Sequence, residues 1–133
     1  MKLLYIMFFF ILKCNSVAIK TAYKQVVIPG IASGVTIIRY STQFEVKRKL
    51  KIQSIQIQDD SINLNYGLFN IDTGKILKPH AVLEKGNYSV EIIAPYSMEL
   101  ENSIDILQLT FLSGKKEYQI LKKVTLKSAL YMR

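Results

Sequence analysis

Residues 35–46 read VTIIRYSTQFEV, and they carry the clearest strand signature in the chain. The even positions hold mostly apolar side chains such as Ile38 and Phe44, whereas the odd positions from Arg39 to Glu45 are polar. Successive side chains of a strand point to opposite faces of a sheet, so a period of two is typical of a strand buried on one face. This stretch therefore predicts a sheet that packs one face on a core.

Shorter runs of the same kind recur on both sides of this stretch, separated by glycine, proline, asparagine and aspartate. The composition agrees, because isoleucine and valine total 26 against 6 alanines, and branched side chains favour strands over helices. The other expected strands cover residues 23–28, 50–57, 62–68, 88–94, 103–112, 117–121 and, as a strand or a loose tail, 124–131. Seven or eight short strands in 133 residues predict one all-β domain, a sandwich or a barrel.

The segment 50–57 breaks the alternation once. Its apolar positions change parity between Ile52 and Ile55. A one-residue slip moves side chains to the other face, so this change predicts a bulge, or burial on both faces, near Gln53 and Ser54.

One local pattern narrows the fold class. Residues 83–92 read LEKGNYSVEI, which has the form L-x-x-G-x-Y-x-V. This pattern resembles the tyrosine corner of immunoglobulin-like and fibronectin-like sandwiches. The resemblance implies that the Tyr88 hydroxyl returns to the backbone upstream, that Gly86 makes the turn, and that Leu83 fills the core. It implies an immunoglobulin-like antiparallel β-sandwich, and nothing about function, because such sandwiches serve many unrelated tasks.

Residues 1–18 differ from the rest and predict a secretory signal peptide. Lys2 is followed by a ten-residue apolar run, LLYIMFFFIL, at residues 3–12. A helix of that length rises about 15 Å, half of the hydrocarbon core of a bilayer, so the run is too short to span one. Ser16 and Ala18 provide the small residues of a cleavage site. We therefore expect cleavage after Ala18 and a single sandwich domain at residues 19–133, secreted or periplasmic.

Two alternatives to this cleavage remain open. Ile11 and Leu12 suit the apolar part of a lipoprotein signal that would be cut before Cys14, although Lys13 stands where a small residue is wanted. The segment could also stay uncleaved as an interfacial anchor. Cleavage after Ala18 would leave a chain with 16 basic and 10 acidic residues and no cysteine.

The scarcity of chemically versatile residues limits the possible activities. The chain has one cysteine, one histidine and no tryptophan, which disfavours thiol–imidazole dyads, zinc sites and disulfide frameworks. His80 follows Pro79, which predicts a loop or an edge strand. An oxygen-rich calcium site is conceivable at Asp59, Asp60 and Ser61 with Asn63 and Asn65, but strand alternation already explains the two asparagines. We expect no cofactor and no metal.

The sequence Asp72-Thr73-Gly74 matches the D-T-G of aspartic proteases, in which two carboxylates share a proton. Lys75 follows it, and a positive charge there would favour ionised carboxylates over a shared proton. The other interpretation is a turn in which Asp72 caps backbone N–H groups and Gly74 adopts a positive φ. The turn is the interpretation that we favour.

The net charge of +8 raises the question of a polyanionic partner. Basic residues gather in two segments, and their combined patch would comprise Lys47, Arg48, Lys49, Lys51, Lys115, Lys116, Lys122 and Lys123. If the fold brought these together, they could hold phosphates or acidic glycans. Alternatively, the lysines solubilise turns and protect edge strands. Nucleic acid is not an expected partner of an exported chain.

These observations predict a non-enzymatic binding or scaffolding module of the cell envelope or extracellular space. Its expected partner is another macromolecule, reached by default through pairing at a sheet edge. Two alternatives come from other classes: a dimeric aspartic hydrolase that uses Asp72, and a carrier of a small ligand inside a closed barrel.

Overall fold

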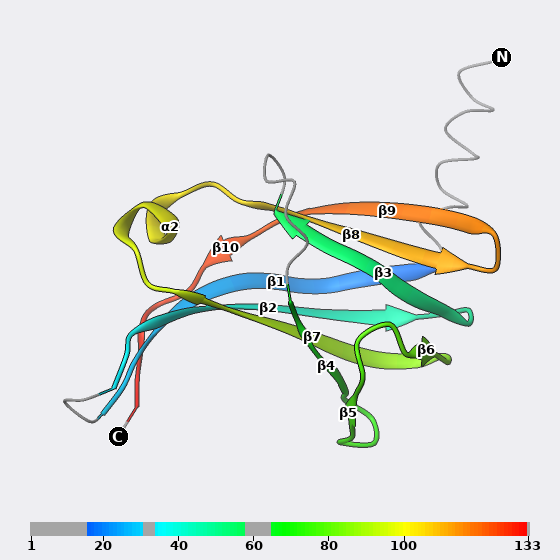
Figure 1. Cartoon of the computed structure of the whole chain (residues 1–133), viewed down its shortest axis with the longest axis horizontal. Coiled ribbons are helices and arrows are strands. Elements are labelled where there is room, and N and C mark those ends of the chain that lie inside the picture. Colours follow the sequence, from blue (N-terminus) through cyan, green and yellow to red (C-terminus); the bar gives the residue numbers. More distant parts are fainter. Residues whose placement is uncertain (1–15, 31–33, 58–64, 133) are drawn as a thin grey trace, which may run out of the picture.

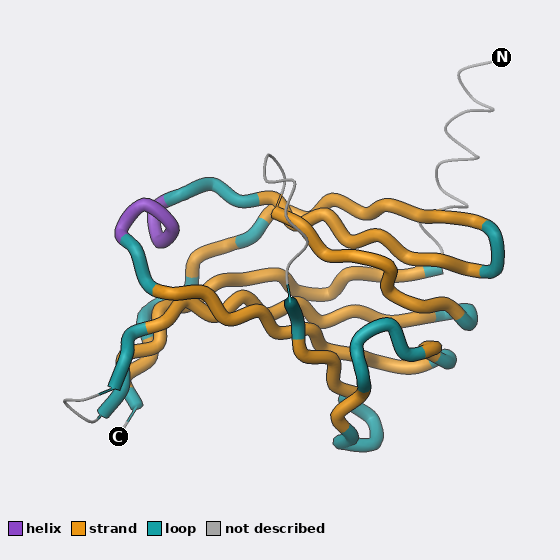
Figure 2. The backbone as a smooth tube through the Cα atoms, in the orientation of Figure 1, coloured by secondary structure: helices purple, strands orange, loops and turns teal. Residues whose placement is uncertain are grey.

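A computed structural model describes residues 16–30, 34–57 and 65–132 of the chain (Figure 1). The described residues form strands with one short helix, as the backbone tube in Figure 2 shows. The elements are β1 (Val17–Ile28), β2 (Ile37–Val46), β3 (Leu50–Ile57), β4 (Gly67–Asn70), β5 (Ile76–Leu77), β6 (Val82–Leu83), β7 (Gly86–Pro95), α2 (Met98–Asn102), β8 (Ile106–Ser113), β9 (Lys116–Lys123), β10 (Thr125–Leu126) and β11 (Leu130–Tyr131). No helix within these ranges is long and apolar enough to cross a membrane.

The strands form two sheets, one above the other in Figure 1. The larger sheet has the order β10-β1-β2-β7-β4-β5, with β11 also beside β1, and the smaller has the order β6-β3-β8-β9. Neighbours are antiparallel except for β10 and β11, which run parallel to β1. The all-β prediction is confirmed, and seven of the described strands have four residues or more. The remaining four have two residues each; β10 and β11 lie within residues 124–131, expected as a strand or a loose tail, whereas β5 and β6 were not expected as strands.

A single apolar core lies between the two sheets and contains side chains from both. The predicted inner face of β2 is confirmed, because Ile38, Phe44 and Val46 are fully buried. Phe44 packs its ring edge-on against Phe111 of the opposite sheet, with 5.7 Å between ring centroids. The strand begins at Ile37, two residues later than expected.

The predicted irregularity in β3 is a bulge. The pairing of β3 with β8 shifts register between Ile52 and Ser54. The extra residue restores the inward direction, so Ile52 and Ile55 are both buried in spite of their odd spacing.

The first strand begins six residues earlier than the pattern predicted. Val17 pairs with Val46 of β2 and is buried, and the Lys47 N–H donates to the Ser16 carbonyl at 2.9 Å. Cleavage after Ala18 remains a prediction, and it would remove the first two residues of β1. The rest of the predicted signal segment, including Cys14, lies outside the described residues.

Tyr88 makes a short hydrogen bond near the start of β7. Its hydroxyl donates to the Glu84 carbonyl at 2.8 Å, and its ring stacks on Phe44 at 6.0 Å. Leu83 is fully buried, and the nearest atoms to a side chain added at Gly86 would be those of Asp72 and Tyr88. Membership of the immunoglobulin-like family stays a prediction.

The connection between β7 and β8 differs from the prediction. The strand expected from Ser103 begins at Ile106, and a five-residue helix, α2, precedes it. Ser97 caps this helix by accepting a hydrogen bond from the Leu100 N–H at 3.0 Å. The helix places the connection across one end of the sandwich, seen at the left of Figure 1.

Candidate functional site

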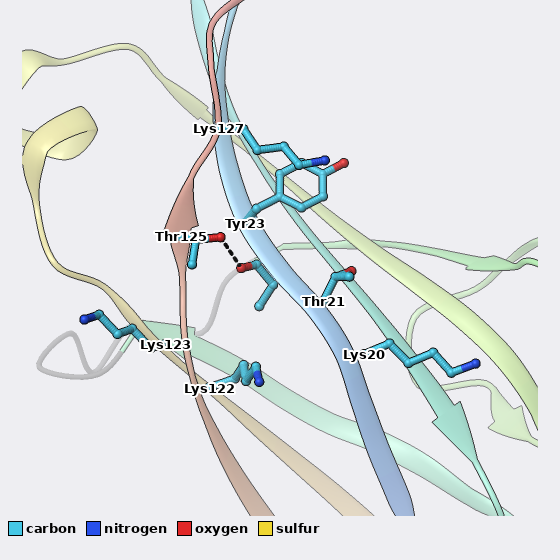
Figure 3. A pocket seen from close by; sticks show the side chains of 8 residues that line it. Lys20, Thr21, Tyr23, Lys122, Lys123, Thr125 and Lys127 are labelled. Carbon is cyan, nitrogen blue, oxygen red and sulfur yellow. Dashed lines mark hydrogen bonds between the residues drawn. The ribbon is translucent and has the colours of Figure 1, made fainter.

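A groove of about 480 Å³ lies on the surface where β1 meets the end of β9 and the start of β10 (Figure 3). Its lining consists of Lys20, Thr21, Ala22, Tyr23, Lys122, Lys123, Thr125 and Lys127. Four of these eight residues are lysines, and none is acidic. The groove is therefore a concentrated source of positive potential at one edge of the sandwich.

Two local irregularities build this groove. Lys20 is the extra residue of a bulge in β1, because Ile19 pairs with Phe44 and Thr21 pairs with the adjacent Gln43, which leaves Lys20 without a partner position in β2. On the other wall the chain crosses between the sheets at Val124, whose N–H donates to the Asp105 carbonyl at 2.9 Å. The crossing holds Lys122 and Lys123 on one side of the groove, opposite β1.

Thr125 links the β10 wall of the groove to the β1 wall by a hydrogen bond. Its hydroxyl donates to the Ala22 carbonyl at 3.3 Å, which is the dashed line in Figure 3. Above it, the Lys127 ammonium lies 3.7 Å from the centre of the Tyr23 ring. This cation–π contact holds Lys127 over β1 while leaving the charge exposed to solvent.

The lysines do not converge on one point. Lys20 and Lys123 extend to opposite sides of the groove in Figure 3. The Lys20 ammonium donates to the Asn87 side-chain oxygen at 3.1 Å, whereas Lys122 and Lys123 are exposed. Charges spread along a groove suit an anion that is itself extended, since a single small anion would contact only one or two of them.

The basic patch predicted from the sequence is divided by the fold. Lys122 and Lys123 lie at one end of β9, and Lys115 and Lys116 lie at its other end, about 23 Å away at a strand rise of roughly 3.3 Å per residue. The second group adjoins the turn between β2 and β3, because the Ser113 hydroxyl donates to the Lys49 carbonyl at 3.3 Å. Both turns lie at the right of Figure 1.

The group at the turns comprises Lys47, Arg48, Lys49, Lys51, Lys115 and Lys116, all exposed. This group has acidic residues among its direct neighbours. Lys49 lies 3.9 Å from the Glu84 carboxylate, and Glu117 follows Lys116 directly on β9. The fold therefore places the predicted basic residues in two groups instead of one patch, and Lys20 of the groove was not among them. The bulge in β1 places Lys20 in the lining of the groove. The alternation of apolar and polar residues in this segment did not predict that bulge.

Asp72 occupies a turn, as predicted. The Asn70 carbonyl accepts from the Gly74 N–H at 2.9 Å, and Gly74 has a φ of 74°. The Asp72 carboxylate accepts from the Asn87 backbone N–H at 2.9 Å and from the Asn87 side-chain amide at 3.2 Å. These hydrogen bonds lower the pKa of Asp72, and the Lys20 charge acts in the same direction. The ionised Asp72 carboxylate therefore links the turn to β7 by hydrogen bonds. In a dyad that shares a proton, by contrast, one carboxyl group has a raised pKa.

His80 lies in an exposed turn after Pro79, with a φ of 66°. Its Nδ1 is 2.9 Å from the Ile52 carbonyl, and the ring packs edge-on against Tyr66. Within the described ranges, no group of three or more histidine, cysteine, aspartate or glutamate side chains is placed to hold a metal ion. The calcium alternative falls on residues 58–64, outside those ranges, apart from the exposed Asn65.

A buried ionic network was missed in the sequence. Lys24 of β1 is 2% exposed, and its ammonium donates to Asp105 at 2.9 Å and to the Leu100 carbonyl at 2.6 Å. The Tyr40 hydroxyl donates to the same Asp105 oxygen at 2.9 Å. Burial, reinforced by the Asp105 carboxylate, raises the pKa of Tyr40 well above its usual range, so its hydroxyl remains a donor. The network attaches the connection around α2 to the larger sheet.

The sequence was also compared with known proteins. No protein-family model matches it, and no curated protein is similar to it at a significant level.

Proposed function

We propose that this chain is an exported, non-enzymatic binding module of the immunoglobulin-like type, and that its lysine groove binds an acidic polysaccharide of the cell envelope or extracellular space. The observation that carries the proposal is the lining of the groove, with four lysines and no carboxylate in about 480 Å³. No acidic residue lines the groove, although the Asp72 carboxylate lies near Lys20.

The chemistry of the lining favours a polymer with repeated carboxylate or sulfate groups. A lysine ammonium is a compact charge on a flexible stem, which attracts anions without the planar geometry that an arginine imposes. Thr21 adds an exposed hydroxyl that can pair with sugar hydroxyls. The Tyr23 ring is covered by Lys127, so base stacking, on which most single-stranded nucleic-acid binders depend, is not offered here.

Binding of this kind depends strongly on salt. Exposed charges more than about 10 Å apart are largely screened at 0.1 M ionic strength. A polymer that neutralises several lysines at once releases its own counterions, and its affinity falls steeply with added salt. We therefore expect weak binding at physiological salt and much tighter binding at low salt.

The test measures binding of fluorescently labelled polygalacturonate by anisotropy, with neutral dextran as the reference polymer. The groove variant replaces Lys122 and Lys123 by glutamine. The matched control makes the same change at Lys115 and Lys116, at the other end of β9. We expect the groove variant to lose about tenfold in affinity, equivalent to about 1.4 kcal/mol, and the control to lose much less. Equal losses in both variants, or no binding by the wild type at low salt, would contradict the proposal.

A further inference from the structure

Strand β9 forms an edge of the smaller sheet. Among the described strands it pairs with β8 alone, over its full length of eight residues. Leu121 on this strand is 54% exposed, although Tyr118 and Ile120 pack against the core. A long edge with an exposed apolar side chain is a template for pairing with another strand.

The hairpin geometry identifies the backbone groups that face outward. Ser113 pairs with Lys116 across the two-residue turn of the hairpin. In such a hairpin these flanking residues exchange hydrogen bonds, and the hydrogen-bonded positions then recur at every second residue. The backbone N–H and C=O groups that point away from β8 therefore belong to Glu117, Gln119, Leu121 and Lys123.

The sequence of β9 is self-complementary about Ile120. When a second copy is laid antiparallel on this edge with the two Ile120 residues opposite each other, Glu117 faces Lys123 of the second copy. Gln119 then faces Leu121, and the outward backbone groups of both copies meet. Opposite charges at directly opposed positions stabilise a sheet, and like charges destabilise it.

Neighbouring registers lack this match. A register centred on Gln119 sets Lys116 opposite Lys122 of the second copy, which places like charges together at both ends. In the register centred on Ile120, Lys122 faces Tyr118 instead. Lysines on an edge strand usually oppose association. In the register centred on Ile120, however, no lysine of β9 faces another, and Glu117 faces Lys123.

We propose that two copies of this chain associate through β9 in the register centred on Ile120, so that their smaller sheets join into one across a twofold axis. The self-complementary charge pattern identifies a second copy as the partner. The association is isologous, because each strand gives the other the same set of contacts. Lys123 also lines the lysine groove, but the association does not depend on a bound polysaccharide and can be tested without one.

The test measures the dimer dissociation constant of the exported protein by sedimentation equilibrium. Glu117→Lys and Lys123→Glu each convert two attractive pairs into two repulsive pairs. We expect each to weaken the dimer about tenfold or more. The double variant E117K/K123E restores both pairs with reversed polarity, and its dissociation constant should return close to the wild-type value. Glu91→Lys, at an exposed position of β7, changes the net charge by the same amount as Glu117→Lys and serves as its control.

A second variant separates pairing from folding. Gln119→Pro removes one outward N–H, which pairs with the second copy but with nothing in β8. We expect loss of the dimer with an unchanged far-ultraviolet circular dichroism spectrum. A wild type that stays monomeric at high concentration, or a double variant as weak as the single variants, would overturn the proposal. Retention of the dimer in Gln119→Pro would overturn it as well.

Discussion

The ammonium of Lys24 lies 2.9 Å from a carboxylate oxygen of Asp105, and the two side chains are only 2% and 7% exposed. Lys24 also donates to the carbonyls of Leu100 and Ser103, and the Ser103 hydroxyl donates to the second oxygen of Asp105 at 2.8 Å. Since both charges are satisfied by several partners, the pair holds the irregular connection between β7 and β8 against β1. Within this connection Leu100 packs against the core, whereas Met98 and Ile104 are exposed and do not anchor it.

Replacing Lys24 by methionine should strongly destabilise the fold. The change leaves the Asp105 carboxylate buried without its counter-charge, which typically costs about 3–5 kcal/mol. The free energy of urea unfolding measures this loss. Lys20→Met, at an exposed position of the same strand, should change stability by less than about 0.5 kcal/mol. Equal effects of the two substitutions would show that the buried pair has no such role.

Stability should fall in acid through Asp105. Burial alone would raise the pKa of this carboxyl, but hydrogen bonds from Lys24, Ser103 and Tyr40 and the charge of Lys24 outweigh burial and lower the pKa below 3.8. A group whose pKa is lowered in the folded state contributes stability above its unfolded pKa and loses it as the pH falls through the folded value.

Unfolding free energies measured from neutral pH to about pH 2 should therefore decline below about pH 4. In Asp105→Asn the protein is less stable at neutral pH, and its stability declines less steeply in acid. Glu91→Gln, which removes an exposed carboxylate, should keep the wild-type profile. If the unfolding free energy of Asp105→Asn fell with pH in parallel with that of the wild type, Asp105 would not be the cause of the decline in acid.

The position of the first residue should affect stability measurably. A chain that starts at Ile19 lacks the buried Val17 side chain and the hydrogen bond from the Lys47 N–H to the Ser16 carbonyl. We expect it to be less stable than a chain starting at Ser16 by about 2 kcal/mol, from apolar burial and one hydrogen bond. A chain starting at Val17 should fall between them. Equal unfolding midpoints for all three would show that residues 16–18 contribute nothing to the fold.

Asp72→Asn should have a small structural effect and no catalytic one. The asparagine keeps one acceptor for the Asn87 N–H, so the thermal midpoint should drop only slightly and by far less than in Lys24→Met. Hydrolysis of a peptide library should be absent in both the wild type and the variant. Peptide hydrolysis by the wild type that is lost in Asp72→Asn would contradict this prediction and support the aspartic-hydrolase alternative.

Alternation predicted the parts of the fold in which a strand is buried on one face. The inner residues of β2 followed from parity alone, because the core selects side chains at every second position. Parity also located the irregularity in β3, and the structure shows that it is a bulge and not burial on both faces. The turn at Asn70–Gly74 followed from residue types that tolerate its geometry. Each of these signals is contained in a dozen residues or fewer.

The missed features depend on contacts between distant segments. Lys24 interrupts an otherwise ordinary strand, and its partner Asp105 is 81 residues away, so nothing nearby in the sequence marks either as buried. Likewise, Lys115 and Lys122 are close in sequence but separated by the length of a strand. Lys20 and Lys127 are far apart in sequence and line one groove.

The parallel pairing of β10 and β11 with β1 has a consequence for the order of folding. The strand that is synthesised first is completed on its outer edge by the strands that are synthesised last, Thr125–Leu126 and Leu130–Tyr131. Until those residues have been synthesised, one edge of β1 is unpaired. The ion pair of Lys24 likewise cannot form before Asp105 has been synthesised. Such long sequence separations slow folding. Under the export that we propose, the chain would cross a membrane unfolded, and this delay would be an advantage, because the domain cannot close before Leu130–Tyr131 have left the ribosome.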